Sequence, residues 1–356
     1  MSMLDDRTLS LWVNYFKGNR FSRYGIEYMK KLVDIEINPE FMLQMQRRWD
    51  TRTHTFRFGN HEMCPTIEEF KAILGIPDER QILHFKWLDS IKPVLKKEFG
   101  FTKHIMKRIT KHHALDLMEL SKEVMSGIYI PENERTQLLT IVIILAHYLL
   151  SPEDNKPSNY VLKVAIELTN RNKDPSAIIL AETLMGLDKS MGKKEILKQG
   201  SPLLLQIWLL DKMGVLQPPP PSIKWMSPLM QMERLLKVQK IDLVKSFDDD
   251  DTPQMIRCTM PWYGIKKMAY SMEGIPIIFL LGLNETTFYI PGRIPQQFGL
   301  SLVPLMPTGA IIHVPKFTQS LHNNFPEKWK SIQRMSIIDH EDEDDEEDLM
   351  SEILNS

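Results

Sequence analysis

The chain has few of the residues that mark secreted, disulfide-bonded proteins. Only two of its 356 residues are cysteines, Cys64 and Cys258, and they lie far apart. This number excludes a disulfide framework and fits the reducing cytosol or nucleus. The first twenty residues carry acids where a secretory signal would be basic, and they lack its apolar run. We therefore expect a protein that is not secreted.

Long apolar runs are also missing. The best candidate for a membrane span, LLTIVIILAHYLL at 138–150, has 13 residues and ends at Ser151-Pro152. A span needs about 20 such residues, so this run is too short to cross a bilayer. We expect a buried core helix here, and no contact with a membrane.

Recognisable catalytic motifs are absent. The sequence has no G-x-S-x-G, no phosphate loop and no G-x-G-x-x-G. His54, His61 and Cys64 lie close together but lack the paired spacing of structural zinc ligands. A nuclease or transposase would hold its metal ions between three carboxylates carried on strands. The β-rich segment of this chain contains only Glu273 and Glu285, so this activity is a remote alternative. We expect no enzyme activity, no metal and no cofactor.

The net charge of −2 conceals an acidic tail. Residues 336–356 hold ten acidic residues and no Lys or Arg, so 36 acidic residues remain elsewhere against 44 basic ones, a formal charge of +8. A block of like charge predicts disorder, here for 336–356. A basic body with an acidic tail is typical of nuclear proteins and equally of well-solubilised ones.

The most basic stretch is 92–111, in which Glu98 is the single acid. Such a stretch can neutralise phosphates. The candidate nucleic-acid contacts are Lys96, Lys97, Lys103, Lys107, Arg108 and Lys111. The favoured interpretation is nevertheless a solvated helix face, because apolar residues such as Leu95 and Ile109 form a partner face for burial. If the stretch does bind nucleic acid, we expect the acidic tail to mask it within the chain.

Hydrophobic periodicity predicts a mainly α, multi-helix globular domain. Helices are expected at 7–17, 23–34, 39–49, 86–98, 102–111, 113–126, 134–150, 157–172, 174–188, 193–213 and 227–247. A further helix starts at the Thr66–Glu69 capping box and stops at Gly75. A short β-containing turn motif lies near 53–64, and a small β-leaning region at about 262–315 has runs at 275–281, 286–290 and 310–314. We divide the chain into a helical core (1–216), a remainder packed on it that begins with a proline spacer (217–335), and the tail.

Three segments carry a family resemblance. The first, 38–77, has an Arg-Trp helix end, a Thr-His-Thr-Phe strand, a Gly-x-x-Glu-Met turn and a Pro-Thr-Ile-Glu-Glu helix start. Its motif residues are Arg48, Trp49, His54, Phe56, Gly59, Glu62, Pro65, Thr66, Glu69 and Gly75. The other two segments are GSPLLLQIW at 200–208, with Trp208, and YIPGRIPQQFG at 289–299, with Arg293 and Gln297. Together they resemble the plant mobile domain family, in its retroelement-associated branch.

This resemblance implies a helical fold, a nuclear location and an origin in plant transposable elements. It also implies a protein partner, such as a phosphatase-like subunit, and a role in silencing or genome maintenance. The leading hypothesis is a non-enzymatic nuclear interaction module, and the alternative is a nucleic-acid-binding remnant that uses 92–111. If His54 and Glu62 pair across the turn of the motif, we expect that pair to hold the fold rather than to do chemistry.

Overall fold

The computed structural model describes most of the chain between residues 35 and 337. The described residues are 35–76, 80–84, 90–111, 114–123, 134–151, 159–170, 173–223, 226, 230, 233–235, 256–298 and 312–337. The helices expected at 7–17 and 23–34, most of the one at 227–247, and the acidic tail from 338 lie outside them. In the described part, helices dominate and the strands form only small antiparallel sheets.

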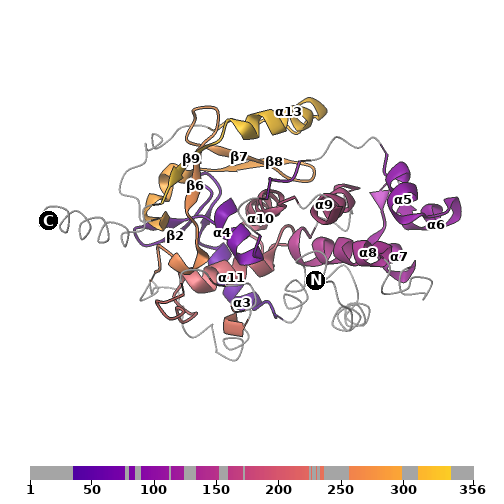
Figure 1. The fold of residues 1–356 in the computed structure, drawn as a ribbon. Coiled ribbons are helices and arrows are strands. Elements are labelled where there is room, and N and C mark those ends of the chain that lie inside the picture. The colour runs from indigo at the N-terminus through magenta and orange to yellow at the C-terminus, as the bar shows by residue number, and fades with distance from the viewer. Residues whose placement is uncertain are drawn as a thin grey trace, which may run out of the picture.

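Three apolar helices form the centre of the fold: α4 (Ile67–Leu74), α10 (Ser176–Ser190) and α11 (Pro202–Lys212). Both α10 and α11 pack against α4 (Figure 1). Nearly every residue of α10 and α11 is buried, which explains why their sequences are apolar all round rather than striped. The helix expected at 193–213 begins only at Pro202, because Gly200 has a φ of +81° and Ser201 caps the helix by accepting a hydrogen bond from Leu204 N.

The N-terminal motif folds as a helix and a three-stranded meander. Helix α3 (Pro39–Gln46) is followed by β1 (Trp49–Asp50), β2 (Thr55–Phe58) and β3 (His61–Met63), in the order β1-β2-β3. Phe56 lies opposite both Trp49 and Met63, so one buried ring connects all three strands. The sequence predicted only a short β-containing turn motif near 53–64 and did not resolve its strands, because strands of two or three residues are too short to show a period.

A second group of helices lies to the right of α10 in Figure 1. They are α5 (Lys92–Phe99), α6 (Lys103–Ile109), α7 (Leu117–Glu123), α8 (Glu134–Ile144), a π-helical turn (Leu145–Leu149) and α9 (Asn159–Asn170). A two-residue hairpin, β4 (Thr110–Lys111) and β5 (Ala114–Leu115), joins α6 to α7. The described residues of 138–150 are almost all buried, so the prediction of a core helix is confirmed and its last turn is π-helical.

The C-terminal part contains two separate strand pairs and one helix. Strand β6 (Lys267–Ser271) pairs with β9 (Gln333–Ser336), and β7 (Ile278–Leu281) pairs with β8 (Thr286–Tyr289). Between β8 and β9 the chain forms 3-10 turns at Pro291–Arg293 and Pro295–Phe298 and the helix α13 (Gln319–Lys330). The strand expected at 310–314 is wrong for its described residues, 312–314, which have no strand. Neither α13 nor β9 was predicted, because α13 is polar and contains Pro326.

Glu182 on α10 fastens the β7–β8 hairpin to the helix. Its carboxylate accepts hydrogen bonds from Leu283 N at 2.6 Å and from Gln199 Nε2 at 2.8 Å. Burial raises the pKa of Glu182 to about 7. Gln199 Oε1 has no partner in the described part of the chain, so rotation of that amide would let it accept the proton of the neutral acid.

We expect Glu182 to make the protein less stable as the pH rises. Its pKa is 4.5 when solvated and about 7 in the fold. The stabilisation is therefore complete below pH 4.5 and is lost as the pH rises through 7, a change of roughly 3 kcal/mol. Urea unfolding of the native chain and of Glu182→Gln at a pH near 5 and near 8 measures this. An equal pH dependence in both proteins would contradict the assignment.

Gly200 is a position where a side chain has no room. A Cβ there would lie 2.3 Å from Thr183 Cα, whereas at Gly192, which also has a positive φ, it would meet nothing within 4 Å. We expect Gly200→Ala to cost at least about 3 kcal/mol, because backbone must move. Gly192→Ala should cost only about 1 kcal/mol of backbone strain. Chemical denaturation of both variants checks this, and equal losses would show that the contact with Thr183 is unimportant.

Candidate polyanion-binding site

Glu69, in the first turn of α4, is the point at which the three motif segments meet. Its carboxylate accepts hydrogen bonds from Trp208 Nε1 at 2.9 Å and Gln297 Nε2 at 2.6 Å. It also forms an ion pair with Lys212 Nζ at 2.9 Å. Glu69 is 2% exposed and Lys212 is 0% exposed, so the pair is cut off from water. Such a buried pair persists only where each charge has several partners.

The start and the end of α4 follow the sequence prediction. Thr66 Oγ1 accepts from Glu69 N at 3.3 Å, and Glu69 Oε2 accepts from Thr66 N at 3.2 Å, which completes the capping box after Pro65. Gly75 ends the helix with a φ of +62°. Both predictions are therefore confirmed, because these signals are local in sequence.

Trp49 and His54 are held by residues that the sequence did not single out. Trp49 Nε1 donates to Asp188 Oδ1 at 2.8 Å, and His54 Nε2 lies 3.0 Å from Asp188 Oδ2 on α10. His54 Nδ1 lies 2.7 Å from the carbonyl oxygen of Phe288, and the two rings stack. The pair between His54 and Glu62 that the sequence left open does not form, because His54 faces α10 and β8 instead.

Glu62 pairs with the third motif segment. Arg293 donates to it twice, at 2.7 and 2.6 Å, and Arg57 lies 3.6 Å away. Gly59 makes the turn before β3 with a φ of +56°. Arg48 lies over the ring of Phe58, 5.3 Å from its centroid. The C-terminal part therefore closes over the N-terminal meander through a bidentate ion pair.

These motif residues form a structural network rather than an open site. Trp49, Phe56, Trp208 and Gln297 are all nearly inaccessible to water. The side-chain N–H groups of Trp49, Trp208 and Gln297 donate to Asp188 or Glu69 within the fold, so little is left for a ligand. No spacing rule could have shown that Asp188 and Lys212 complete the network.

We expect Glu69→Gln to destabilise the protein by about 3 kcal/mol or more, because Lys212 is left charged and unpaired in the interior. Lys212→Met in the same background should restore part of this loss, since it removes the stranded charge. Guanidinium unfolding of the two single variants and the double variant measures the coupling between them. Additive losses would mean that the two groups do not interact.

A cleft of about 770 Å³ lies beside α4, on the side away from this network. Five chain segments line it: α4, residues 80–84, residues 173–174 just before α10, residues 266–267 at the start of β6, and α13 with β9. Its basic residues are Lys71, Arg80, Lys173, Lys266, Lys267, Lys330 and Arg334. Glu68 and Asp174 are the only acids, so the lining has a formal excess of five positive charges.

Several of these cations are not neutralised. Lys330 pairs with Glu327 at 2.8 Å and Lys71 lies 3.5 Å from Asp174. Lys266, Lys267 and Arg334 are exposed, and no acidic side chain in the described part of the chain forms an ion pair with them. Pairing of β6 with β9 sets Lys267 opposite Ser336 and Arg334 two residues away on the same face. Three exposed cations without a close ion pair therefore line one edge of the cleft, and Glu68 is the acid that interacts electrostatically with Arg334.

The two acids of the cleft, Glu68 and Asp174, accept hydrogen bonds from backbone N–H groups of the fold. Glu68 Oε1 accepts from Ala269 N at 3.0 Å, while its Oε2 has no partner among the described residues. Burial raises the pKa of Glu68 and of Asp174.

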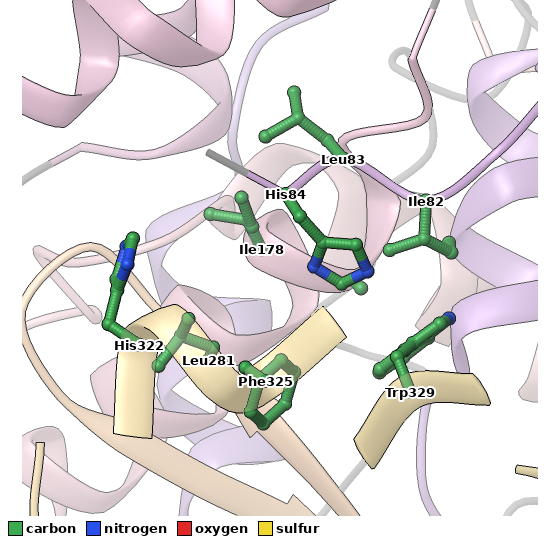
Figure 2. A pocket seen from close by; sticks show the side chains of 9 residues that line it. Ile82, Leu83, His84, Ile178, Leu281, His322, Phe325 and Trp329 are labelled. Carbon is green, nitrogen blue, oxygen red and sulfur yellow. The ribbon is translucent and has the colours of Figure 1, made fainter. Parts of the chain in front are cut away.

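The cleft adjoins a small apolar pocket with a volume of only about 10 Å³, shown in Figure 2. His84 lies between the two surfaces and meets the rings of Phe325 and Trp329 edge-on. Burial lowers the pKa of His84 to about 4 and also lowers that of His322. Both histidines are therefore neutral at pH 7, and the pocket has room for about one water.

The basic stretch 92–111 contributes nothing to the cleft. It forms α5 and α6, at the opposite end of the molecule from β6 and β9 in Figure 1. Lys96, Lys97, Lys103 and Lys107 are exposed, Arg108 pairs with Glu123, and Lys111 lies in β4. Leu95, Phe99 and Ile109 are buried beneath them, as a solvated helix face requires. The cleft was missed because its cations are scattered between residues 71 and 334.

Among the residues that the structure describes, no three His, Cys, Asp or Glu side chains gather as metal ligands would. The described helices include none that is both long and apolar enough to cross a membrane.

The fold and the cleft define a mainly helical protein with a cationic cleft. The family model of the plant mobile domain matches residues 25–349, and the chain belongs to this transposon-related family. No curated protein and no solved structure matches the chain.

Proposed function

We propose that this protein is a non-enzymatic nuclear module that binds the phosphate backbone of a nucleic acid in the cationic cleft. The observation that carries the proposal is the convergence of seven Lys and Arg residues on one cleft that contains only two acids. Binding there would release counterions from the phosphates, which is the main source of affinity for nucleic acids.

The composition of the cleft favours a nucleic acid over a single phosphate. The seven cations come from five segments of the chain, and Ile67, Ile82 and Trp329 add apolar surface to the same lining. A positive groove with apolar or aromatic surface is the arrangement by which proteins hold single strands. The origin of the family in transposable elements is consistent with such a ligand.

The module would act by bringing a nucleic acid and a protein partner together. In this proposal, a bound nucleic acid is presented to a protein partner, such as the phosphatase-like subunit that the family resemblance implies, in silencing or genome maintenance. The motif network around Glu69 keeps the cleft in shape and takes no part in chemistry.

The test compares two variants of the full chain that lose the same charge. In the cleft variant, Lys266, Lys267, Lys330 and Arg334 become alanine. In the control, Lys96, Lys97, Lys103 and Lys107 become alanine. We expect the cleft variant to bind a labelled single strand at least about tenfold more weakly, and the slope of log K against log salt to become shallower by about 3. Fluorescence anisotropy over a salt series, with single-stranded and duplex probes, measures both.

The control variant should retain its affinity within about threefold, since its lysines project from separate exposed turns. If the control loses affinity and the cleft variant does not, the stretch 92–111 is the contact and the proposal is wrong. If neither variant changes binding, the cleft does not bind nucleic acid, and an acidic protein segment becomes the better candidate.

A further inference from the structure

We propose that the acidic tail of the chain, residues 339–352, occupies the cationic cleft as an internal ligand and excludes other polyanions from it. That the tail regulates nucleic-acid binding rests on the proposed function, whereas occupancy of the cleft does not.

The path of the chain brings the tail to the cleft. Strand β9 contributes Arg334 to the lining and ends at Ser336, directly opposite Lys267. The next residue, Ile337, donates its backbone N–H to the carbonyl oxygen of Lys266 at 2.9 Å. The first tail acid, Asp339, follows two residues later. The acidic segment therefore starts within two residues of the least neutralised edge of the cleft.

The charges are complementary. Ten acidic residues lie between 339 and 352, with no Lys or Arg among them. The cleft has a formal excess of five positive charges, and the described part of the chain offers no acid that pairs with Lys266, Lys267 or Arg334. The tail is thus the nearest segment along the chain with the charge that the cleft lacks.

The tail is long enough to extend far from the end of β9. An extended chain spans about 3.3 Å per residue, so the segment from Ile337 to Glu352 can reach roughly 50 Å. Tethering also gives the tail an effective concentration in the millimolar range, so a weak ionic contact would still be formed most of the time. The basic helices α5 and α6 lie at the other end of the molecule (Figure 1). The acidic tail, which the sequence led us to expect over residues 92–111, is therefore better placed to cover the cleft.

Carbodiimide cross-linking of the full chain tests occupancy without any nucleic acid. The reagent joins a carboxylate to a lysine Nζ that touches it, with loss of water. We compare tail cross-links to five cleft lysines (Lys71, Lys173, Lys266, Lys267 and Lys330) and to five on α5 and α6 (Lys92, Lys96, Lys97, Lys103 and Lys107). We expect the cleft set to dominate at low salt and to fade at high salt. Tail cross-links that are absent, evenly spread or mainly on α5 and α6 would overturn the proposal.

A full chain with a neutral tail tests competition. Each of the ten tail aspartates and glutamates is replaced by asparagine or glutamine. We expect about tenfold tighter binding of a single strand at low salt, and less than about twofold when the four cleft cations are also alanine. An equal gain in both backgrounds would mean that the tail repels nucleic acid in general, and would overturn the proposal.

The two experiments separate this proposal from the proposed function. Tail cross-links in the cleft, combined with no binding of any oligonucleotide by the neutral-tail chain, would uphold tail occupancy and refute nucleic acid as the ligand. Tight oligonucleotide binding that depends on the cleft, without tail cross-links there, would uphold nucleic acid as the ligand and refute occupancy of the cleft by the tail.

Discussion

A buried carboxylate at the start of α4 joins parts of the chain that are far apart in sequence. Burying the charge of Glu69 alone would cost several kcal/mol, so its partners must be in place. Those partners are Trp208, 139 residues further on, and Gln297, 228 residues further on, together with Lys212. The strand-turn-helix of the motif therefore cannot bury its polar interior until α11 and the segment after β8 have packed against it. This closure couples the N-terminal motif to the C-terminal part.

The cleft exists because of the same closure. Glu69 and Glu68 are neighbours on α4, and they point to different surroundings. Glu69 enters the network, whereas Glu68 borders the cleft and accepts a hydrogen bond from Ala269 on β6. Once Arg293 and Gln297 have fixed the segment after β8, the pairing of β6 with β9 brings Lys267 and Arg334 to one edge. A residue that stabilises the fold thus lies beside one that shapes the proposed site.

The sequence predicted what is encoded locally. The capping box at Thr66 and Glu69, the stop at Gly75 and the buried helix near 138–150 all follow from residues a few positions apart. It could not predict the pairs of Asp188 with Trp49 and His54, because side chains more than 130 residues apart leave no periodic pattern. Helix α13 was missed for the opposite reason, since its local signal is poor and tertiary packing of Phe325 and Trp329 stabilises it. The cleft, assembled from five segments, has no local signal at all.

Charge density along the sequence is therefore a poor guide to where a polyanion would bind. On α5 and α6 the lysines project from convex helices into water, where salt screens each charge separately. In the cleft, cations from five segments face a common space bounded by apolar side chains, and such walls focus the field of the charges that line them. Burial also raises the pKa of Glu68 and of Asp174. The cations that share one space thus come from parts of the sequence that look unremarkable, and the acidic segment follows directly after β9, which contributes Arg334 to that space.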